Sequence, residues 1–330
     1  MLIVLLLLLF VLLPSGWKSE DKKEVVRYVY EYGNESGQNI RKSKMPAEKK
    51  TEIRFKARDD KYYSEHYSPE FYGWLSNFKY IQLSSKEKAA YIQLSRGIDK
   101  HMKVIPLDEP VSFNSLSKIY EMMTTENDVQ MYFTTRVYNY TYDEMHDEVF
   151  SIIPQYRIDI REEHEIRDAL NQKYEDIVSQ IGMNASDEEK ILFFHDYIAE
   201  KCNYHDVTGM TSEELVTLAD NTHFSDAYGA LIENEALCEG YARAYKYLCD
   251  KSGITCGLVS GSAGGEEHMW NIVKLKGKAY SHVDVTWDDH YDKNSGSGYI
   301  GHDYYKKSDE EIGHDHIIDK GLFDYPICPN

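Results

Sequence analysis

The chain is poor in basic residues and in cysteine. Lys and Arg total 37 against 56 Asp and Glu, which gives a formal net charge of −19 at pH 7. This acidity repels phosphate backbones and anionic lipid headgroups, so we expect no nucleic-acid partner. Five cysteines in 330 residues are too few for a disulfide scaffold, and their odd number leaves at least one thiol free or intermolecular. Any pairing among Cys202, Cys249, Cys256 and Cys328 stays open.

The first residues are strongly apolar. Met1 to Leu13 form an unbroken run that is too short to span a bilayer comfortably but has the length of a signal-peptide core. A positively charged start and an A-x-A site are missing, so Pro14-Ser15-Gly16 is the nearest cleavage candidate. We expect residues 1–17 to be a signal peptide of a secreted or cell-surface protein, with an uncleaved membrane anchor as the alternative.

The next part of the chain is polar and then becomes periodic. Residues 18–64 lack sustained apolar spacing, which predicts a linker with one short strand at 25–30. Between 129 and 158, spacing of period two predicts a β-hairpin whose second half is confined by Pro154 to a sheet edge or a bulge. Apolar periodicity and capping residues predict helices over 84–98, 114–123, 163–181 and 186–202.

A helix and three strands are predicted further along. Cys238 opens a helix that Gly253 should end, and strands follow over 255–259, 268–275 and 279–287. Helices followed by an antiparallel sheet indicate an α+β fold. We place a boundary within 160–185, which divides an N-terminal α+β region at 65–180 from a C-terminal domain at 181–330.

Cys238 is the candidate nucleophile. At the first turn of a helix, free N–H groups and the macrodipole favour the thiolate, although Glu239 opposes this effect. Gly240 and Ala242 carry almost no side chain, which predicts close packing of this helix against a neighbour. A cysteine without partner residues is more often buried and unreactive. A catalytic role for Cys238 therefore depends on a histidine and an acid that lie close to it.

The hairpin that follows supplies those partners. If its turn is centred on Lys276, His268 faces Asp284 with Cβ atoms about 4.5–5.5 Å apart, within reach of a hydrogen bond. A register shift of two residues would keep both side chains on one face. An aspartate that orients a histidine, which in turn activates a cysteine, is the arrangement needed for covalent acyl transfer.

Other histidines and acids compete for these roles. His282 would face Trp270, which favours a structural role, and Asp288 and Asp289 are better placed for a turn. His195, Cys202 and His205 lack the spacing of a zinc site, so we expect satisfied helix-end residues and no metal. The glycine-rich segment 261–265 lacks the context of a phosphate loop and is interpreted as a flexible loop.

Three segments resemble the motifs of bacterial transglutaminase-like domains. They are Leu237-Cys238-Glu239-Gly240-Tyr241-Ala242-Arg243-Ala244, His268-Met269-Trp270-Asn271-Ile272-Val273, and Tyr280-Ser281-His282-Val283-Asp284-Val285-Thr286-Trp287-Asp288. Cys202-Asn203-Tyr204 and 228–231 resemble the approach to the cysteine in that family, and 302–316 resembles its closing region. The resemblance is strong over about 186–328 and weaker over about 84–185, which resembles an N-terminal companion region.

The resemblance implies a papain-like α+β core and a cysteine-dependent reaction at an amide. Cys238 would be the nucleophile, His268 the general base and acid, and Asp284 its orienting partner. Tyr204 would be an oxyanion donor, with a packed aromatic as the alternative, and Trp270 and Trp287 would line the cleft or the core. No cofactor is required by this chemistry.

The acyl acceptor and the substrate are left open by the resemblance. We expect a peptidase or amidase acting on protein or cell-wall peptides, with membrane contact only through an N-terminal anchor. The polar rim before His268 favours water, although Glu266 and Glu267 would attract a cationic amine. The alternatives are a cross-linking transglutaminase and a non-catalytic binding or surface module.

Overall fold

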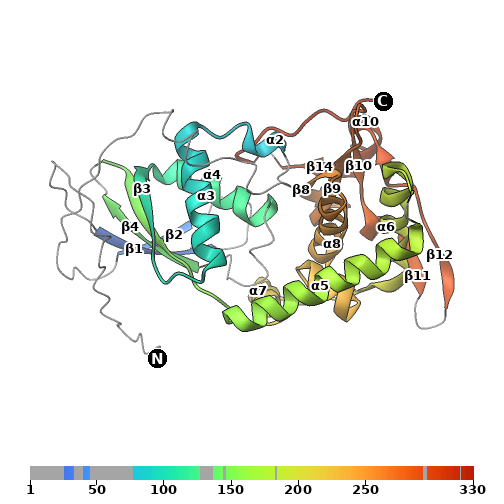
Figure 1. The fold of residues 1–330 in the computed structure, drawn as a ribbon, viewed down its shortest axis with the longest axis horizontal. Helices are drawn as coiled ribbons and strands as arrows, with labels where there is room; N and C mark the ends of the chain where they lie inside the picture. The colour runs from blue at the N-terminus through green and yellow to red at the C-terminus, as the bar shows by residue number, and fades with distance from the viewer. Residues whose placement is uncertain are drawn as a thin grey trace.

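A computed structural model gives the architecture of the protein. It describes residues 26–32, 40–44, 77–126, 137–143, 146–182, 184–292, 296–319 and 321–330. These residues form two five-stranded sheets with helices packed on them, and two small two-stranded sheets. The sheet built from the N-terminal part lies at one end of the molecule and the sheet built from the C-terminal part toward the other (Figure 1).

The N-terminal sheet is antiparallel throughout. Its strands, in spatial order, are β2 (Ile40–Lys44), β1 (Val26–Tyr32), β4 (Val137–Asp143), β5 (Glu148–Ile153) and β3 (Ile105–Val111). The strand predicted at 25–30 is confirmed as β1. The linker interpretation of 18–64 does not hold at β2, whose backbone pairs with β1, because backbone pairing does not require an apolar sequence. The rest of that range lies outside the described residues.

The hairpin predicted between 129 and 158 is confirmed as β4 and β5. Residues 129–136 of that prediction lie outside the described part. β5 ends at Ile153, directly before Pro154, and lies between β4 and β3, so it is not an edge strand; its pairing with β4 is irregular between Val149 and Ser151, which agrees with the predicted alternative of a bulge. The edge belongs to β3, which contains Pro106 and Pro110 and whose pairing with β5 is irregular.

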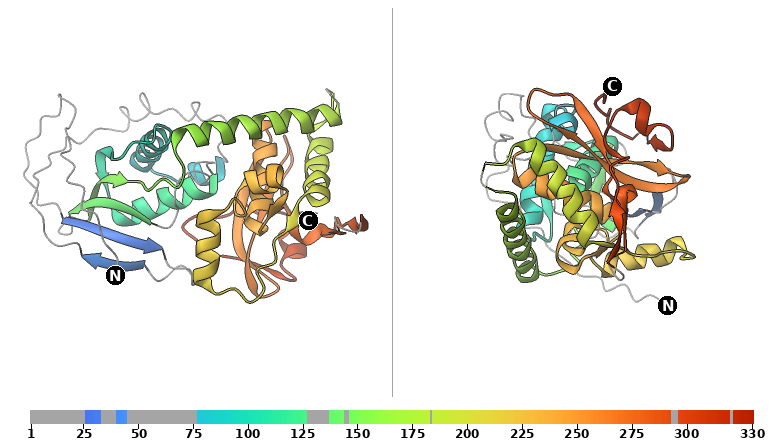
Figure 2. Two further views of the ribbon diagram at one scale, coloured as in Figure 1. Left: turned by 90° about the horizontal axis from the view of Figure 1, so that it is seen from below. Right: turned by 90° about the vertical axis from the view of Figure 1, so that its right-hand side faces the viewer.

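All four predicted helices are present: α3 (Ser85–Asp99), α4 (Phe113–Glu126), α5 (Ile160–Ile181) and α6 (Asp187–Lys201). Ser84 and Ser186 each form a capping box with the glutamate three residues later. The shorter helices are α2 (Asn77–Tyr80), α7 (Ser212–Asn221), α9 (Val285–Asp288), α10 (Asp309–Ile312) and the π-helical η3 (Gly229–Glu233). α5 begins near the N-terminal sheet and runs alongside the C-terminal part (Figures 1 and 2).

The C-terminal sheet carries the candidate site. Its strands, in spatial order, are β13 (Tyr305–Lys307), β10 (Tyr280–Val283), β9 (Glu266–Lys274), β8 (Thr255–Ala263) and β14 (His316–Ile318). α8 (Cys238–Lys251) packs across β8 and β9. Two small pairs complete this part, β6 (Asn203–Tyr204) with β7 (Glu235–Ala236), and β11 (Asp289–Asp292) with β12 (Ser297–Ile300). A helix on an antiparallel sheet agrees with the predicted α+β class.

The register between β9 and β10 differs from the predicted one by two residues. Val283 lies opposite Asn271, so paired residue numbers sum to 554 instead of the predicted 552. The turn hydrogen bond runs from Lys278 N–H to the Leu275 carbonyl, and Gly277 takes a φ of 75° inside it. That φ favours glycine and moves the centre of the turn one residue beyond Lys276. β10 is also shorter than predicted, because the chain turns into α9 after Asp284.

The glycine-rich segment before His268 is a hairpin, so its interpretation as a flexible loop is wrong. Gly261 and Ala263 belong to β8, and Ala263 pairs with Glu266 across the two-residue turn Gly264-Gly265. Both turn glycines have positive φ, 60° and 92°, as such a tight connection requires.

The N-terminal and C-terminal parts share a buried junction. Their buried side chains form one continuous apolar cluster, which includes Tyr91 of α3 and Tyr245 of α8. At its edge Glu126 of α4 pairs with the ammonium groups of Lys79, at 3.2 Å, and Lys246, at 3.6 Å.

The predicted domain boundary near 160–185 coincides with α5 and remains a prediction. Residues 1–17 lie outside the described part, within which no helix is long and apolar enough to cross a membrane.

Candidate active site

Cys238 begins α8 and is partly exposed, whereas the other four cysteines are buried. Leu237, the N-cap residue, has no side-chain hydrogen bond to the first turn. The N–H groups of this turn and the positive end of the helix therefore stabilise negative charge at the thiol. The charge of Glu239 is offset by Arg243, because its carboxylate lies 2.6 Å from the guanidinium of Arg243.

Glycine allows α8 to approach the loop that precedes it. A Cβ at Gly240 would lie 2.5 Å from the Phe224 carbonyl oxygen and 2.7 Å from the Cβ of Ala236. A Cβ at Gly229 would lie 2.0 Å from the His223 carbonyl oxygen. The close packing predicted from Gly240 is confirmed, and the neighbour is loop backbone.

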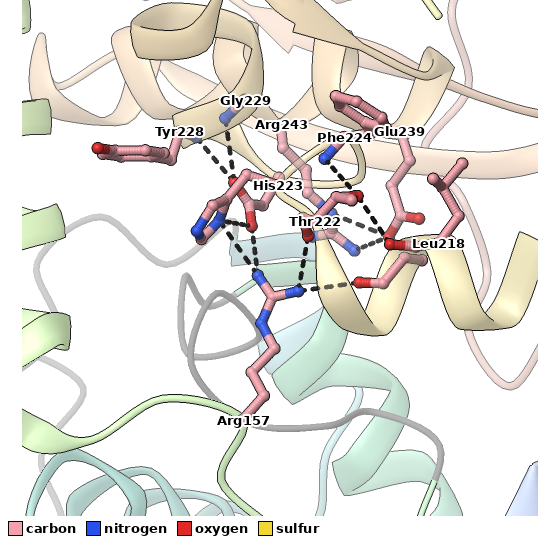
Figure 3. A network of polar contacts seen from close by, with 11 residues as sticks. Arg157, Leu218, Thr222, His223, Phe224, Tyr228, Gly229, Glu239 and Arg243 are labelled. Atoms are coloured by element: carbon pink, nitrogen blue, oxygen red, sulfur yellow. Dashed lines mark hydrogen bonds and ion pairs between the residues drawn. The ribbon is translucent and has the colours of Figure 1, made fainter. Parts of the chain in front are cut away.

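Arg157 fixes this loop from the N-terminal part of the chain. Its guanidinium donates to the Thr222 carbonyl at 3.0 Å and pairs with Asp226 at 2.5 Å (Figure 3). Asp226 also accepts from the backbone N–H of Tyr228 at 3.0 Å. No sequence signal points to Arg157, because it lies 69 residues before Asp226 and belongs to no local motif.

His268 and Asp284 are hydrogen-bonded, as the hairpin predicted. The Nε2 of His268 lies 2.6 Å from the Oδ2 of Asp284. The pair survives the register difference, because a shift of two residues preserves the face on which each side chain lies. Asp284 is not opposite His268 within the sheet. It is instead the N-cap of α9, where its Oδ1 accepts from the backbone N–H groups of Thr286 and Trp287 at 3.0 and 3.2 Å.

The pair is electrostatically coupled to Cys238. Burial alone would lower the pKa of His268, but hydrogen bonds to Asp284 and Cys238 and the charges of both groups raise it to about 10. Burial would raise the pKa of Asp284, and its histidine partners bring it below the usual value. Because Nε2 faces Asp284, Nδ1 is the nitrogen left to meet the sulfur. At neutral pH the imidazole is thus held protonated between a carboxylate and a thiol.

A second histidine shares the carboxylate of Asp284. The Nε2 of His316, in β14, lies 3.0 Å from the same Oδ2, and its Nδ1 lies 2.5 Å from Asp315. The Tyr304 hydroxyl donates to Asp315 at 2.6 Å. Sequence analysis placed His316 in a closing region but gave it no role. Its three-residue strand shows no periodicity, and its partner strand, β8, lies far away in the sequence.

Tyr204 lies on the approach to Cys238. In β6 it pairs with Ala236, two residues before the cysteine, and its side chain is 47% exposed. Burial of the hydroxyl and the charges of Cys238 and Glu266 raise its pKa to about 12. The hydroxyl is therefore protonated at neutral pH and close enough to the thiol to be affected by its charge.

The two tryptophans of the motifs have different surroundings. Trp270 is fully buried and donates its indole N–H to His282 at 3.0 Å, so of the two predicted places, the cleft or the core, it lies in the core. It is a core residue because its side chain points from β9 into a layer closed by His316, with ring centroids 5.0 Å apart. Trp287 is partly exposed, and its ring centroid lies 6.1 Å from that of His268. His282 has the structural role predicted for it.

Asp288 is more than a turn residue. It is fully buried at the end of α9 and accepts from His195 Nε2 and from the Tyr304 N–H, both at 3.1 Å.

The residues His195, Cys202 and His205 do not converge on one point. His205 pairs with Glu235 at 2.7 Å, and the Cys202 thiol faces the Asn203 carbonyl. In the described part of the chain, three groups have donor atoms close enough for a metal ion. They are His195 with Asp196 and His302, His268 with Asp284 and His316, and His282 with Asp309 and Cys328.

Comparison with known families identifies the region that holds the cysteine, the histidine and the aspartate. Residues 175–285 match the transglutaminase-like superfamily. The resemblance predicted from the sequence is confirmed over this segment, which contains Tyr204, Cys238, His268 and Asp284 but ends before His316.

Solved structures show weaker likeness. A protein described as a TGase is 15% identical, with 42% of this chain and 41% of that chain covered and a TM-score of 0.32. A "Putative Cysteine Protease from Cytophaga hutchinsonii" is 11% identical over 55% of this chain and 68% of that chain, with a TM-score of 0.28. The present chain therefore spans less than half the length of the TGase. The search of curated proteins returned no match.

Proposed function

We propose that the protein is a cysteine-dependent acyl-transfer enzyme with a papain-like catalytic arrangement, in which Cys238 attacks an amide carbonyl. The observation that carries this proposal is the double engagement of His268. One ring nitrogen lies 2.6 Å from a buried carboxylate, and the other is coupled to a partly exposed thiol at a helix N-terminus. A nucleophile, a base and an orienting acid are thus brought together in one site.

The reaction proceeds in two halves. The Cys238 thiolate adds to the carbonyl carbon, and the resulting oxyanion meets the backbone N–H of Cys238 and the hydroxyl of Tyr204. As the C–N bond breaks, imidazolium His268 gives its proton to the departing amine, which leaves a thioester. In the second half His268 takes a proton from the incoming nucleophile, which displaces the thiolate. Asp284 holds the ring in one orientation and stabilises its positive charge throughout.

We propose water as the main acceptor, which makes the enzyme an amidase or peptidase on protein or cell-wall peptides. Cys238 is partly exposed and Tyr204 is 47% exposed, so solvent reaches the nucleophile in the described part of the protein. Cross-linking is the second candidate. Glu266 is exposed and close enough to affect the ionisation of Tyr204, so it would attract a cationic amine. Action outside the cell rests on the predicted signal at residues 1–17.

The test combines a glutamine-containing protein substrate with a labelled primary amine. Ammonia released in excess of amine incorporation, or new N-termini, supports hydrolysis. Ammonia that equals amine incorporation, with no new N-termini, supports cross-linking, because thioester formation at a glutamine releases one ammonia for each amine that follows. Cys238→Ala should abolish both products, with Cys249→Ala, which alters a buried thiol of the same helix, as the matched control. If wild-type protein and Cys238→Ala behave alike on every substrate, the acyl-transfer proposal is wrong and a binding module is favoured.

A further inference from the structure

The Oδ2 atom of Asp284 contacts two imidazole rings. His268 is held at 2.6 Å and His316 at 3.0 Å, while Oδ1 is occupied by two backbone N–H groups of α9. A single catalytic histidine would leave this carboxylate with one charged partner. The second ring therefore changes both the position and the effective charge of the group that orients His268.

The surroundings of His316 define its protonation state. Its side chain is fully buried, and its two nitrogens face two carboxylates, Asp284 and Asp315. A neutral imidazole has only one N–H, so only the imidazolium donates to both carboxylates. Hydrogen bonds from the Tyr304 hydroxyl and from His316 offset the effect of burial and keep the pKa of Asp315 below its usual value, so that this carboxylate is ionised.

Packing leaves the ring of His316 little freedom. Ring centroids of Trp270, Trp287 and Tyr304 lie 5.0, 4.7 and 5.3 Å from that of His316. The titratable groups that face it come from every neighbouring element. They are His268 on β9, His282 on β10, Asp284 at the start of α9, Tyr304 before β13, and Asp315 before β14.

We propose that His316 is a positioning residue of this site, which as an imidazolium fixes the shared carboxylate of Asp284 and limits how tightly that carboxylate retains the proton on His268. This inference rests on the proposed Cys–His–Asp function. Asp284 alone would hold the His268 proton strongly, which favours the thiolate but weakens the imidazolium as an acid toward the leaving amine. A second cation on the same oxygen shifts this balance toward proton donation.

The sign and size of the effect follow from charge. Removing a cation raises the pKa of a neighbouring acid, so loss of His316 should raise that of His268. The two ring centroids are 5.7 Å apart. With an effective dielectric constant of about 20 to 40, Coulomb's law predicts a rise of about one to two pH units.

The first measurement follows the ring nitrogen shifts of His268 by NMR against pH. A Cys238→Ala background removes the thiolate, which brings the titration of His268 to lower pH. Addition of His316→Gln, which keeps a neutral donor but removes the charge, should raise the midpoint by about one to two pH units. His164→Gln, an exposed histidine on α5, is the matched control and should leave it unchanged.

The second measurement is the pH profile of Cys238 alkylation by iodoacetamide, with Cys238 intact. His316→Gln should move the profile to higher pH, because the Cys238 thiolate loses a neighbouring cation, and His164→Gln should leave the profile unchanged. EDTA is present throughout, since the donors of His268, Asp284 and His316 lie within 4.8 Å and could hold a metal ion.

Both measurements proceed without substrate, so the two proposals can fail separately. Unchanged midpoints in folded His316→Gln, with only a lower melting temperature, would show a merely structural residue and overturn the inference. If His316→Gln does not fold, His316→Asn, a smaller neutral amide, decides, and an unmoved alkylation profile in that variant has the same meaning. A shifted midpoint in a protein that turns over no amide would support the role of His316 and count against acyl transfer.

Discussion

Asp284→Asn removes the charge from a carboxylate that accepts four hydrogen bonds. Oδ1 accepts two backbone N–H groups, so the amide oxygen of asparagine must take that place. The amide NH2 then faces His268 and His316, whose nitrogens are donors to Oδ2 in the wild type. At least one imidazole must lose its donor contact or take the other tautomer. The substitution thus changes the hydrogen-bonding pattern while it preserves the shape of the side chain.

Two magnitudes follow from this geometry. Loss of the orienting carboxylate in an analogous triad lowers turnover about 10⁴-fold, and we expect a loss of that order. Asp284 is only 1% exposed, so an unsatisfied donor at its position should also cost about 1–3 kcal/mol of unfolding free energy. Folding should therefore survive with a lower melting temperature.

The assay is turnover of the best amide substrate, together with thermal melting. Asp309→Asn is the matched control, because it alters another Asp–His pair of the same sheet, with His282 at 2.9 Å, outside the reaction path. It should retain most activity and melt at a higher temperature than Asp284→Asn, because the Asp309 side chain is 43% exposed. Equal turnover in the two variants, both folded, would refute the role of Asp284.

Three further predictions use the same site. With limiting iodoacetamide, Cys238 should be labelled before the four buried cysteines, as read by site-resolved mass spectrometry, and preferential labelling of any of them would contradict the assignment. Tyr204→Phe should lower turnover about 10²- to 10³-fold at almost unchanged stability, because one oxyanion donor is lost at a half-exposed position; unchanged turnover would leave only a packing role. The pKa of His268 is about 10 in the folded protein, above its ordinary 6.5, so its stabilising contribution is complete below about pH 6.5 and is lost as the pH rises through about 10. The difference in unfolding free energy between wild type and His268→Gln should shrink over that interval, and a constant difference would show that His268 has no raised pKa.

Asp288 shows where sequence reasoning was incomplete. Its position after a strand indicated a turn, which predicts a mild effect of Asp288→Asn. The structure buries this carboxylate against His195, 93 residues away, and against the backbone of Tyr304. Residues so distant in sequence meet only when the fold brings α6 and the segment before β13 together, and neither periodicity nor motif spacing carries that information. We now expect Asp288→Asn to lower stability, because a buried acceptor site changes to a donor.

Local signals, by contrast, predicted the five longest helices of the described residues, α3, α4, α5, α6 and α8. Ser84 and Ser186 each precede a glutamate by three residues, and both form the expected capping boxes. The strands β2 and β14 were harder to predict. β2 has a mostly polar sequence and pairs with the neighbouring β1, and β14 pairs with β8, which lies far away in the chain. The polar composition of 18–64 therefore concealed β2, and His316 could not be recognised as a partner of Asp284.

The pairing of His268 with Asp284 was predictable for a reason that does not depend on the exact register of the hairpin. Side chains on a strand alternate, so two residues whose numbers have the right parity share a face in every register that differs by two. The turn at Gly277 shifted the register by that amount and left the parity unchanged. The alternation of side chains does not determine the final position of the carboxylate, because Asp284 lies beyond the end of β10. The start of α9 supplies it, because two backbone N–H groups hold Oδ1 and thereby aim Oδ2 at the histidines. A strand thus selects the face, and a helix cap fixes the atom that orients the base.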